Sequence, residues 1–157
     1  MAKQLVNLDT KCKIVAEVQN PPWAQRAHDL CKSRTETITR MMGILNDLAG
    51  KEHHQQSFEA LEERIFEMPL SVEVRSDWVE PRELTNRSYT MPVEYRILLS
   101  TGGPATQIIG TLDEHGEPEQ AYLQAQDWFE PWTNGYSPSP HEALMLLSFA
   151  RTFYYGG

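Results

Sequence analysis

Two pairs of residues carry side chains that could bind a metal ion. His28 and Cys31 are three residues apart, so they would share one face of a helix, and His53 and His54 follow later in the chain. Zinc sites use such ligands in sets of four. Yet no paired C-x-x-C is present, and adjacent histidines in a helix point about 100° apart. The sequence therefore favours polar histidines near a helix start and a small buried cysteine, with no metal and no cofactor predicted.

A glycine pair offers a second kind of chemistry. The segment "STGGPAT" (Ser100 to Thr106) could present backbone N–H groups to an anion. Nucleotide-binding glycines normally open a helix, whereas these join two predicted strands, and Pro104 removes one donor. A glycine-permitted turn is therefore the favoured interpretation. The alternative function is a small enzyme or a nucleotide- or anion-binding module that uses Arg96, Thr101, Gly102 and Gly103.

Carboxylates are numerous but show no catalytic arrangement. Paired acids catalyse proton transfer only where their surroundings separate their pKa values, and no residue pattern marks any of them as buried. The signatures G-x-S-x-G and H-E-x-x-H are missing from the sequence. Whether the chain is an enzyme stays uncertain, a non-enzymatic role is favoured, and no catalytic residue is assigned.

An acidic and aromatic phrase occurs twice, as "DWVEP" from Asp77 and as "DWFEPW" from Asp127. In both copies the tryptophan follows an alternating segment and a proline stops it, which is typical of a strand end. This pattern favours Trp78 and Trp128 as side chains that close the core. Trp132 is as well placed to be an exposed anchor for a partner, since tryptophan contributes strongly to interfaces.

Charge is unevenly distributed along the chain. The net charge is −8, and no lysine or arginine occurs from Ile97 through Ala150, where seven Asp and Glu side chains lie. Nucleic-acid surfaces need cations, so we expect no direct binding of nucleic acid and instead a basic partner. The predicted contact residues are Asp113, Glu114, Glu117, Glu119, Asp127, Glu130 and Trp132. This expectation requires these carboxylates to form one continuous surface that guanidinium groups do not neutralise.

Helical periodicity marks three elements that must position these residues. "NPPW" predicts a helix start, and apolar residues recur at helical spacing from Trp23 to Leu48, with Gly50 as a stop. A second run spans Phe58 to Met68, so we expect an antiparallel helical hairpin. Near the C-terminus, Ser139 and Glu142 predict a capping box that opens a third helix, which Gly156 would end.

Between the helices the pattern alternates with a period of two. Four segments predict strands: "PLSVEVRS", "VEYRILL", "TQIIGTL" and "QAYLQAQDW". Leu70, Val72 and Val74 should face inward, and the polar alternates predict one solvated sheet face. The segment 77–91 is the expected long loop. The fold class is therefore α+β: an N-terminal helical hairpin, a four-stranded, mainly antiparallel sheet, and a C-terminal helix packed on one face.

Length and composition complete the expectation. The 157 residues, of which 40% are hydrophobic, predict a single domain over 1–157, with 1–19 a loosely attached segment. No apolar run approaches the roughly 18 residues of a membrane span. Cys12 and Cys31 are expected to be reduced thiols, which places the protein in the cytoplasm of a bacterial host cell as a monomer or homodimer.

The segment "EYRILLSTGGPATQIIGTLDEHGEPEQAYLQAQDWFEPWT" resembles small proteins encoded by phages, prophages and other mobile elements. The similarity covers about residues 65–135. The resemblance implies a setting and no site residues: such accessory proteins are often inhibitors of host defence, including anti-CRISPR proteins. It implies a partner that is a basic surface of a host protein or ribonucleoprotein complex that handles nucleic acid.

Overall fold

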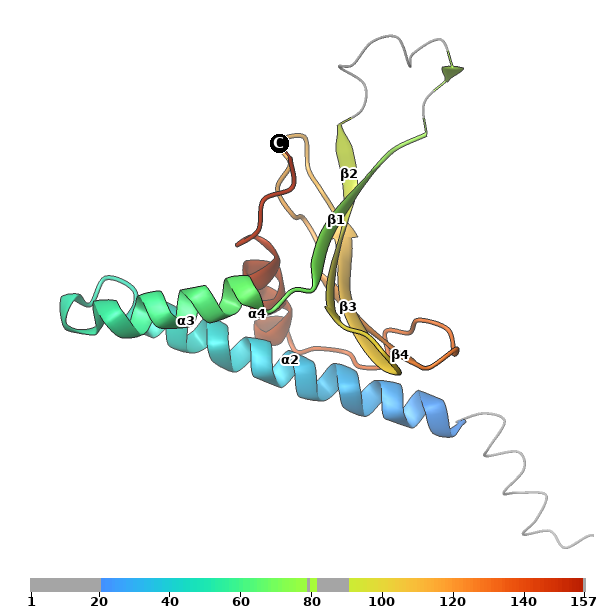
Figure 1. Ribbon diagram of the computed structural model, residues 1–157, viewed down its shortest axis with the longest axis horizontal. Coiled ribbons are helices and arrows are strands. Elements are labelled where there is room, and N and C mark those ends of the chain that lie inside the picture. The colour runs from blue at the N-terminus through green and yellow to red at the C-terminus, as the bar shows by residue number, and fades with distance from the viewer. Residues whose placement is uncertain (1–20, 79, 82–90, 157) are drawn as a thin grey trace, which may run out of the picture.

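The first and last of the described helices begin where the sequence predicts, and the middle one begins three residues before the predicted run from Phe58. The computed structural model describes residues 21–78, 80–81 and 91–156. Helix α2 spans Pro22–Leu48 with a proline in its first turn, and a short 3₁₀ helix η1 (Glu52–His54) leads into α3 (Gln55–Glu67). Helix α3 runs back along the C-terminal part of α2, so the two form the predicted hairpin (Figure 1).

The four predicted strands form one antiparallel sheet. Strands β1 (Ser71–Ser76), β2 (Pro92–Ser100), β3 (Pro104–Thr111) and β4 (Tyr122–Asp127) are neighbours in chain order. Helix α4 (Pro140–Ala150) follows β4 after a loop, and α2, α3 and α4 lie on one side of the sheet (Figure 1). The fold is α+β, as predicted. We call the helix-covered side of the sheet the inner face and the other side the outer face.

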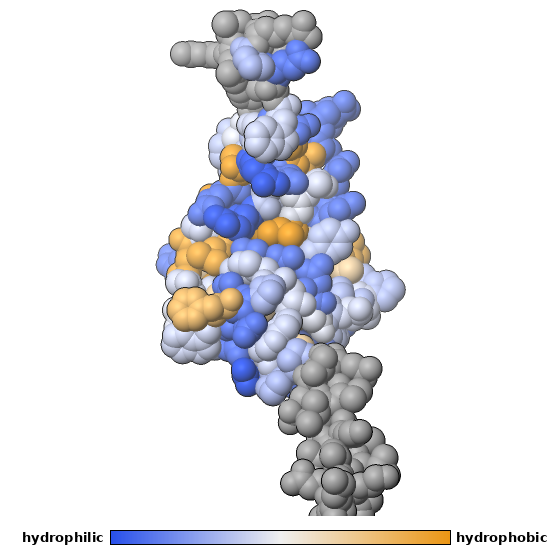
Figure 2. Space-filling model, turned by 90° about the vertical axis from the view of Figure 1, so that its right-hand side faces the viewer, coloured by the Kyte–Doolittle hydropathy of each residue, from blue (hydrophilic) through white to orange (hydrophobic). Residues whose placement is uncertain are grey.

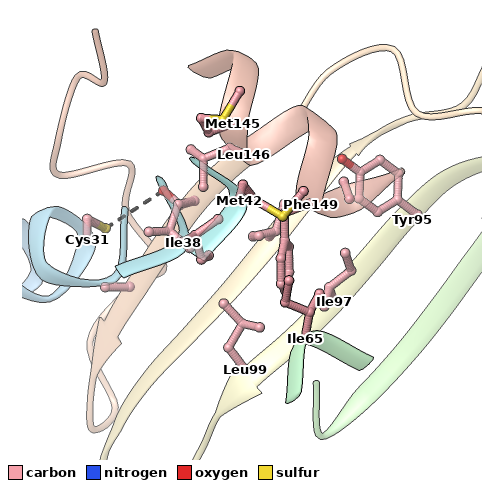
Figure 3. Close-up of a cluster of buried hydrophobic side chains, with 14 of the residues drawn as sticks. Cys31, Ile38, Met42, Ile65, Tyr95, Ile97, Leu99, Met145, Leu146 and Phe149 are labelled. Carbon is pink, nitrogen blue, oxygen red and sulfur yellow. Dashed lines mark hydrogen bonds between the residues drawn. The ribbon is translucent and has the colours of Figure 1, made fainter. Parts of the chain in front are cut away.

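The core lies between α2, α4 and the inner face. Ile38 and Met42 of α2 meet Leu146 and Phe149 of α4, and Ile97 contributes from β2 (Figure 3). Because β-strand side chains alternate, β4 sends Leu123 and Ala125 inward as well. Helix α2 therefore packs against both the sheet and α4.

The inner face of β1 is not covered as the sequence predicted. Val72 and Val74 do share a face with Ile97 and Tyr95, their cross-strand partners. Nevertheless they are exposed, with Val74 at 46%, because β1 is the edge strand and lies beyond the helical layer. Leu70, which precedes the strand, is exposed too.

Helix α4 also differs at its end. The capping box between Ser139 and Glu142 is present as predicted. The helix ends at Ala150, before the glycine that was expected to stop it, and the chain then turns so that Tyr155 is buried and Tyr154 exposed. The predicted long loop falls mostly on residues 79 and 82–90, and the expected N-terminal segment on 1–19; both lie outside the described residues.

Candidate functional site

Asp127 is buried against a cation from the N-terminal half of the chain. It is the last residue of β4 and only 6% exposed, and Arg26 of α2 donates to its Oδ2 over 2.5 Å. The N-terminal half of α2 packs on β4, where Cys31 also donates to the carbonyl of Leu123. The pair joins α2 to β4, and removal of Arg26 would leave a buried carboxylate without its counter-charge. Asp127 is too buried to contact a partner, so the prediction that it is a contact residue is corrected.

Asp127 and the five residues that follow it form what we call the aromatic loop, Asp127 to Trp132. Trp128 has a φ of 54°, a rare left-handed conformation for a large residue. Its backbone N–H donates to the carbonyl of Gly103 over 3.1 Å, and its ring lies against the same glycine. Even so, Trp128 is 61% exposed and the next side chain, Phe129, is 99% exposed. The prediction that Trp128 closes the core is therefore wrong.

Both ends of the aromatic loop are fixed. At its start, the backbone N–H of Glu130 donates to the backbone carbonyl of Asp127, and the carboxylate of Asp127 is paired with Arg26. After its end, Thr133 and Ala125 exchange two backbone hydrogen bonds of 3.0 Å. The half-buried Trp132 lies between these anchors. The loop thus presents its exposed rings on a backbone whose conformation is set before any partner arrives.

The acidic turn, Asp113 to Glu119, lies at the opposite end of β4. Asp113 accepts hydrogen bonds from the backbone N–H groups of His115 and Glu117, at 2.8 and 2.9 Å. These bonds hold the pKa of Asp113 below its ordinary value, and the bond from Glu117 makes the largest contribution. Arg151 donates to the carbonyl of Pro118, so the cation that follows α4 lies beside this turn. The exposed carboxylates of the turn are Glu114, Glu117 and Glu119.

The predicted acidic surface is therefore divided. Strand β4 separates the acidic turn from Asp127, Glu130 and Trp132, and its six residues span about 17 Å. Arg26 is ion-paired with Asp127, and Arg151 donates to the backbone carbonyl of Pro118 beside the acidic turn. The sequence showed the absence of cations within residues 97–150, but it could not show that cations from outside this range would be brought to them.

The residues predicted for the alternative site do not come together either. Gly102 and Gly103 form the β2–β3 turn with φ of 95° and 131°, and the ring of Trp128 covers Gly103. Thr101 belongs to the same exposed turn. Arg96 lies farther along β2 on the outer face, where it is ion-paired with Glu73 of β1.

The outer face carries a pocket that the sequence did not predict. Its volume is about 600 Å³, and its lining includes the Glu73–Arg96 and Arg75–Glu94 ion pairs together with Gln107 and Tyr122. Gln107 is 5% exposed; its Nε2 donates to Gln124, while its Oε1 has no hydrogen-bond partner among the residues that the structure describes. Figure 2 shows this side of the molecule as mostly hydrophilic with a few hydrophobic residues. A polar residue on the alternate face of a strand is expected to be exposed to solvent. Gln107 is buried only because neighbouring side chains on the outer face cover it.

The first copy of the doubled phrase lies at the other edge of the sheet. Asp77 and Trp78 follow β1, whereas Asp127 ends β4 and Trp128 follows it, and these strands form opposite edges. Asp77 accepts the N–H of Trp78, and the Trp78 side chain is 98% exposed. Trp78 does not close the core, so the sequence prediction is wrong here too. The two phrases end strands alike but have different surroundings.

The candidate metal ligands have separate environments. Cys31 is a buried free thiol, and the ring of His28 packs edge-on against Tyr136 at 5.7 Å. Within residues 21–78, 80–81 and 91–156, no group of three or more His, Cys, Asp and Glu side chains is placed to hold a metal ion. Nor does any helix in those ranges have the length and apolar character needed to cross a bilayer.

Comparison with known proteins adds no relative: no protein-family model, curated protein or solved structure matches this chain.

Proposed function

We propose that this chain is a non-enzymatic binding protein that contacts a partner protein through its aromatic loop. The observation that carries the proposal is the exposure of Phe129 and Trp128 on a loop anchored at both ends. Large aromatic side chains bury much area on binding and lose little conformational freedom, so they dominate many interfaces.

The energetics of the loop favour binding over a purely structural role. A left-handed conformation at a residue with a large side chain costs about 1 kcal/mol or more. At Trp128 this conformation places Phe129 fully in solvent, where it stabilises nothing within the described part of the chain. Burial of the Phe129 ring by a partner would offset this cost. Binding would add little further cost of ordering the loop, because the loop is already held in place.

The resemblance stated above supports the class of partner. In that setting the partner is a basic surface of a host protein or ribonucleoprotein complex that handles nucleic acid, and the protein inhibits it. The charge that such a surface would meet is carried by Glu130 of the aromatic loop and by the exposed Glu114, Glu117 and Glu119 of the acidic turn. Because β4 separates these groups, the acidic turn is a second contact or steers the approach, and the aromatic loop provides the anchor.

The test compares variants of the immobilised protein in a pull-down from host-cell lysate, with captured proteins identified by mass spectrometry. Phe129→Ala should lose at least tenfold of the captured partner, as expected for an interface hot spot. The matched control is Leu144→Ala, which removes an exposed apolar side chain from α4 and should change nothing. Glu117→Lys with Glu119→Lys should reduce capture mainly at low salt.

Three outcomes would decide against parts of the proposal. Full capture by Phe129→Ala would exclude the aromatic loop as the anchor. Full capture by the Glu117/Glu119 double variant at low salt would remove the acidic turn from the contact. A captured partner with no role in nucleic-acid handling would reject the proposed setting but retain the binding surface.

A second candidate function is supported by the outer-face pocket. Gln107 Oε1, which has no partner among the described residues, would accept a hydrogen bond from a small polar ligand. An anionic group on that ligand would have to share the guanidinium groups of Arg75 and Arg96 with Glu94 and Glu73. A thermal-shift screen of nucleotides and organic anions would detect such a ligand. Arg96→Gln should abolish the shift, while Thr101→Ala at the β2–β3 turn should leave it unchanged.

A further inference from the structure

Strand β1 presents an unpaired edge and exposed apolar side chains together. It bonds to β2 on one side, and within the described part of the chain no strand pairs with its other side. Leu70, Val72 and Val74 are exposed on the inner face, and Trp78 is exposed just beyond the strand. Open edges invite pairing with another strand, and proteins usually protect them when they remain monomeric.

The outer face of the same strand carries an ordered charge pattern. Glu73 of β1 is paired with Arg96 of β2, its direct cross-strand partner. Two residues along, the signs are reversed: Arg75 of β1 is paired with Glu94. Strand β1 thus ends the sheet with one acidic and one basic side chain, both partly exposed.

We propose that a second copy of this chain pairs with this edge, β1 against β1 and antiparallel, to form a continuous eight-stranded sheet. The pairing is isologous, so a two-fold axis must pass through it. Residues directly opposite in an antiparallel pair project from the same face, which allows only registers centred on a residue. The side chains of β1 select one of these registers.

The axis lies at Val74. A register centred on Glu73 or on Arg75 places that residue opposite its own copy, and like charges directly opposite each other are destabilising. A register centred on Val72 leaves Glu73 opposite Ser71 and Arg75 opposite a residue before the strand. With Val74 at the axis, Glu73 of each copy faces Arg75 of the other, so two opposite-charge pairs form.

This register also continues the charge pattern across the whole dimer. One outer-face row then contains Arg96 and Glu73 of one copy followed by Arg75 and Glu94 of the other, with alternating signs throughout. The two-fold axis generates the second row. Each charged side chain of β1 thereby acquires a neighbour of opposite sign on both sides.

The inner face is matched by the same register. Val74 packs on Val74 of the second copy, in line with the buried Tyr95 on each side. If the pairing continues two residues past the strand, Trp78 of one copy lies opposite Leu70 of the other. The fully exposed indole and the exposed leucine would then cover each other.

Sedimentation equilibrium of charge variants tests the proposal. The wild type should sediment as a dimer, whereas Glu73→Arg alone and Arg75→Glu alone should each dimerise at least tenfold more weakly, because each creates two like-charge pairs. An equimolar mixture should recover the dimer, since the first variant carries two basic side chains on β1 and they then face the two acidic side chains of the second variant. Changes within each monomer persist in the mixture, so the recovery reports the contact between copies.

Two controls keep the outcome decisive. Glu114→Arg makes the same charge change at the exposed acidic turn and should leave the dimer intact. Circular dichroism establishes that each variant is folded before it is mixed. A wild type that stays monomeric at a concentration of several hundred micromolar overturns the dimer, and a mixture that does not recover overturns the register.

Cysteine cross-linking tests the position of the axis independently. In a Cys12→Ser background, Val74→Cys places two thiols next to each other across the axis, at a Cα separation that a disulfide accepts. Oxidised glutathione should convert this variant to a covalent dimer. Val72→Cys, also exposed but away from the axis, should cross-link far less. Stronger cross-linking of Val72→Cys would show that the strands pair in another register, and no cross-linking of either variant would show that they do not pair.

Discussion

Gly110 of β3 shows how one missing side chain allows two strands and a tyrosine to meet. A Cβ built there would lie 1.9 Å from the carbonyl oxygen of Gln120 and 2.7 Å from the ring and hydroxyl of Tyr95. That hydroxyl donates to the same carbonyl over 2.5 Å. Burial raises the pKa of Tyr95 well above its ordinary value, so the hydroxyl keeps its proton and remains a donor at physiological pH. The glycine is required by space and not by backbone conformation.

We therefore expect Gly110→Ala to destabilise the protein by about 3 kcal/mol or more, because backbone atoms must move apart. Gly43→Ala in α2 is the matched control: a Cβ there meets nothing within 4 Å, and alanine favours the helix by about 1 kcal/mol. Urea denaturation followed by circular dichroism measures both. Equal effects of the two substitutions would contradict the close approach at Gly110.

At the residue scale the sequence predicted local contacts and missed distant ones. The capping box was predictable because Ser139 and Glu142 are three residues apart and the bonds depend on that spacing alone. The pairing of Arg26 with Asp127 joins residues 101 positions apart, so no local pattern carries it. This single contact changes Asp127 from a candidate binding residue into a structural one.

At the scale of elements, the turn between β3 and β4 depends on one carboxylate. Asp113 accepts two backbone N–H groups, and its own N–H donates to the carbonyl of Glu117, so the residue closes the turn from both sides. Gly116 supplies the positive φ that the tight turn requires, at 78°. The charged form of Asp113 is the better acceptor, which makes the stability of the turn dependent on pH.

The pKa of Asp113 is lowered by the hydrogen bond from Glu117 first, against some desolvation, and then by that from His115. A carboxyl whose pKa is lower in the folded state stabilises the fold above its unfolded value and loses this contribution as the pH falls through the folded value. The melting temperature of wild type should therefore exceed that of Asp113→Asn at pH 7. The difference should diminish below pH 3.8, the ordinary value. A difference that stays constant down to pH 2 would contradict this role.

Alternation and period predicted which strands and helices form, but not what covers them. Val72 and Val74 alternate with polar residues as well as Ile97 and Leu99 do, and both pairs project from the inner face. Only the second pair lies under helices, because the position of a strand in the sheet is decided by pairing between distant segments. For the same reason the exposure of Trp78 and Trp128 could not be predicted from the proline that follows each.

At the scale of the whole molecule, α2 is the element on which the others converge. It contacts α3, α4 and β4, and its buried side chains extend from Ala27 to Met42. Two surfaces remain outside this organisation: the aromatic loop after β4 and the free edge of β1. They lie at opposite edges of the sheet, so a dimer formed through β1 leaves both aromatic loops open to a partner.

Cys31 reports whether α2 and the sheet unfold together. Its side chain is buried against β4, and burial raises the pKa of its thiol, so it should not react with a thiol reagent in the folded protein. In a Cys12→Ser variant, labelling across a urea series should show the same midpoint as the loss of helical circular dichroism. Ser33→Cys, exposed on the same helix, should label at once without urea. Rapid labelling of Cys31 in the absence of urea would mean that α2 separates from β4 while the rest stays folded, which would also release Asp127 and the aromatic loop from their anchor.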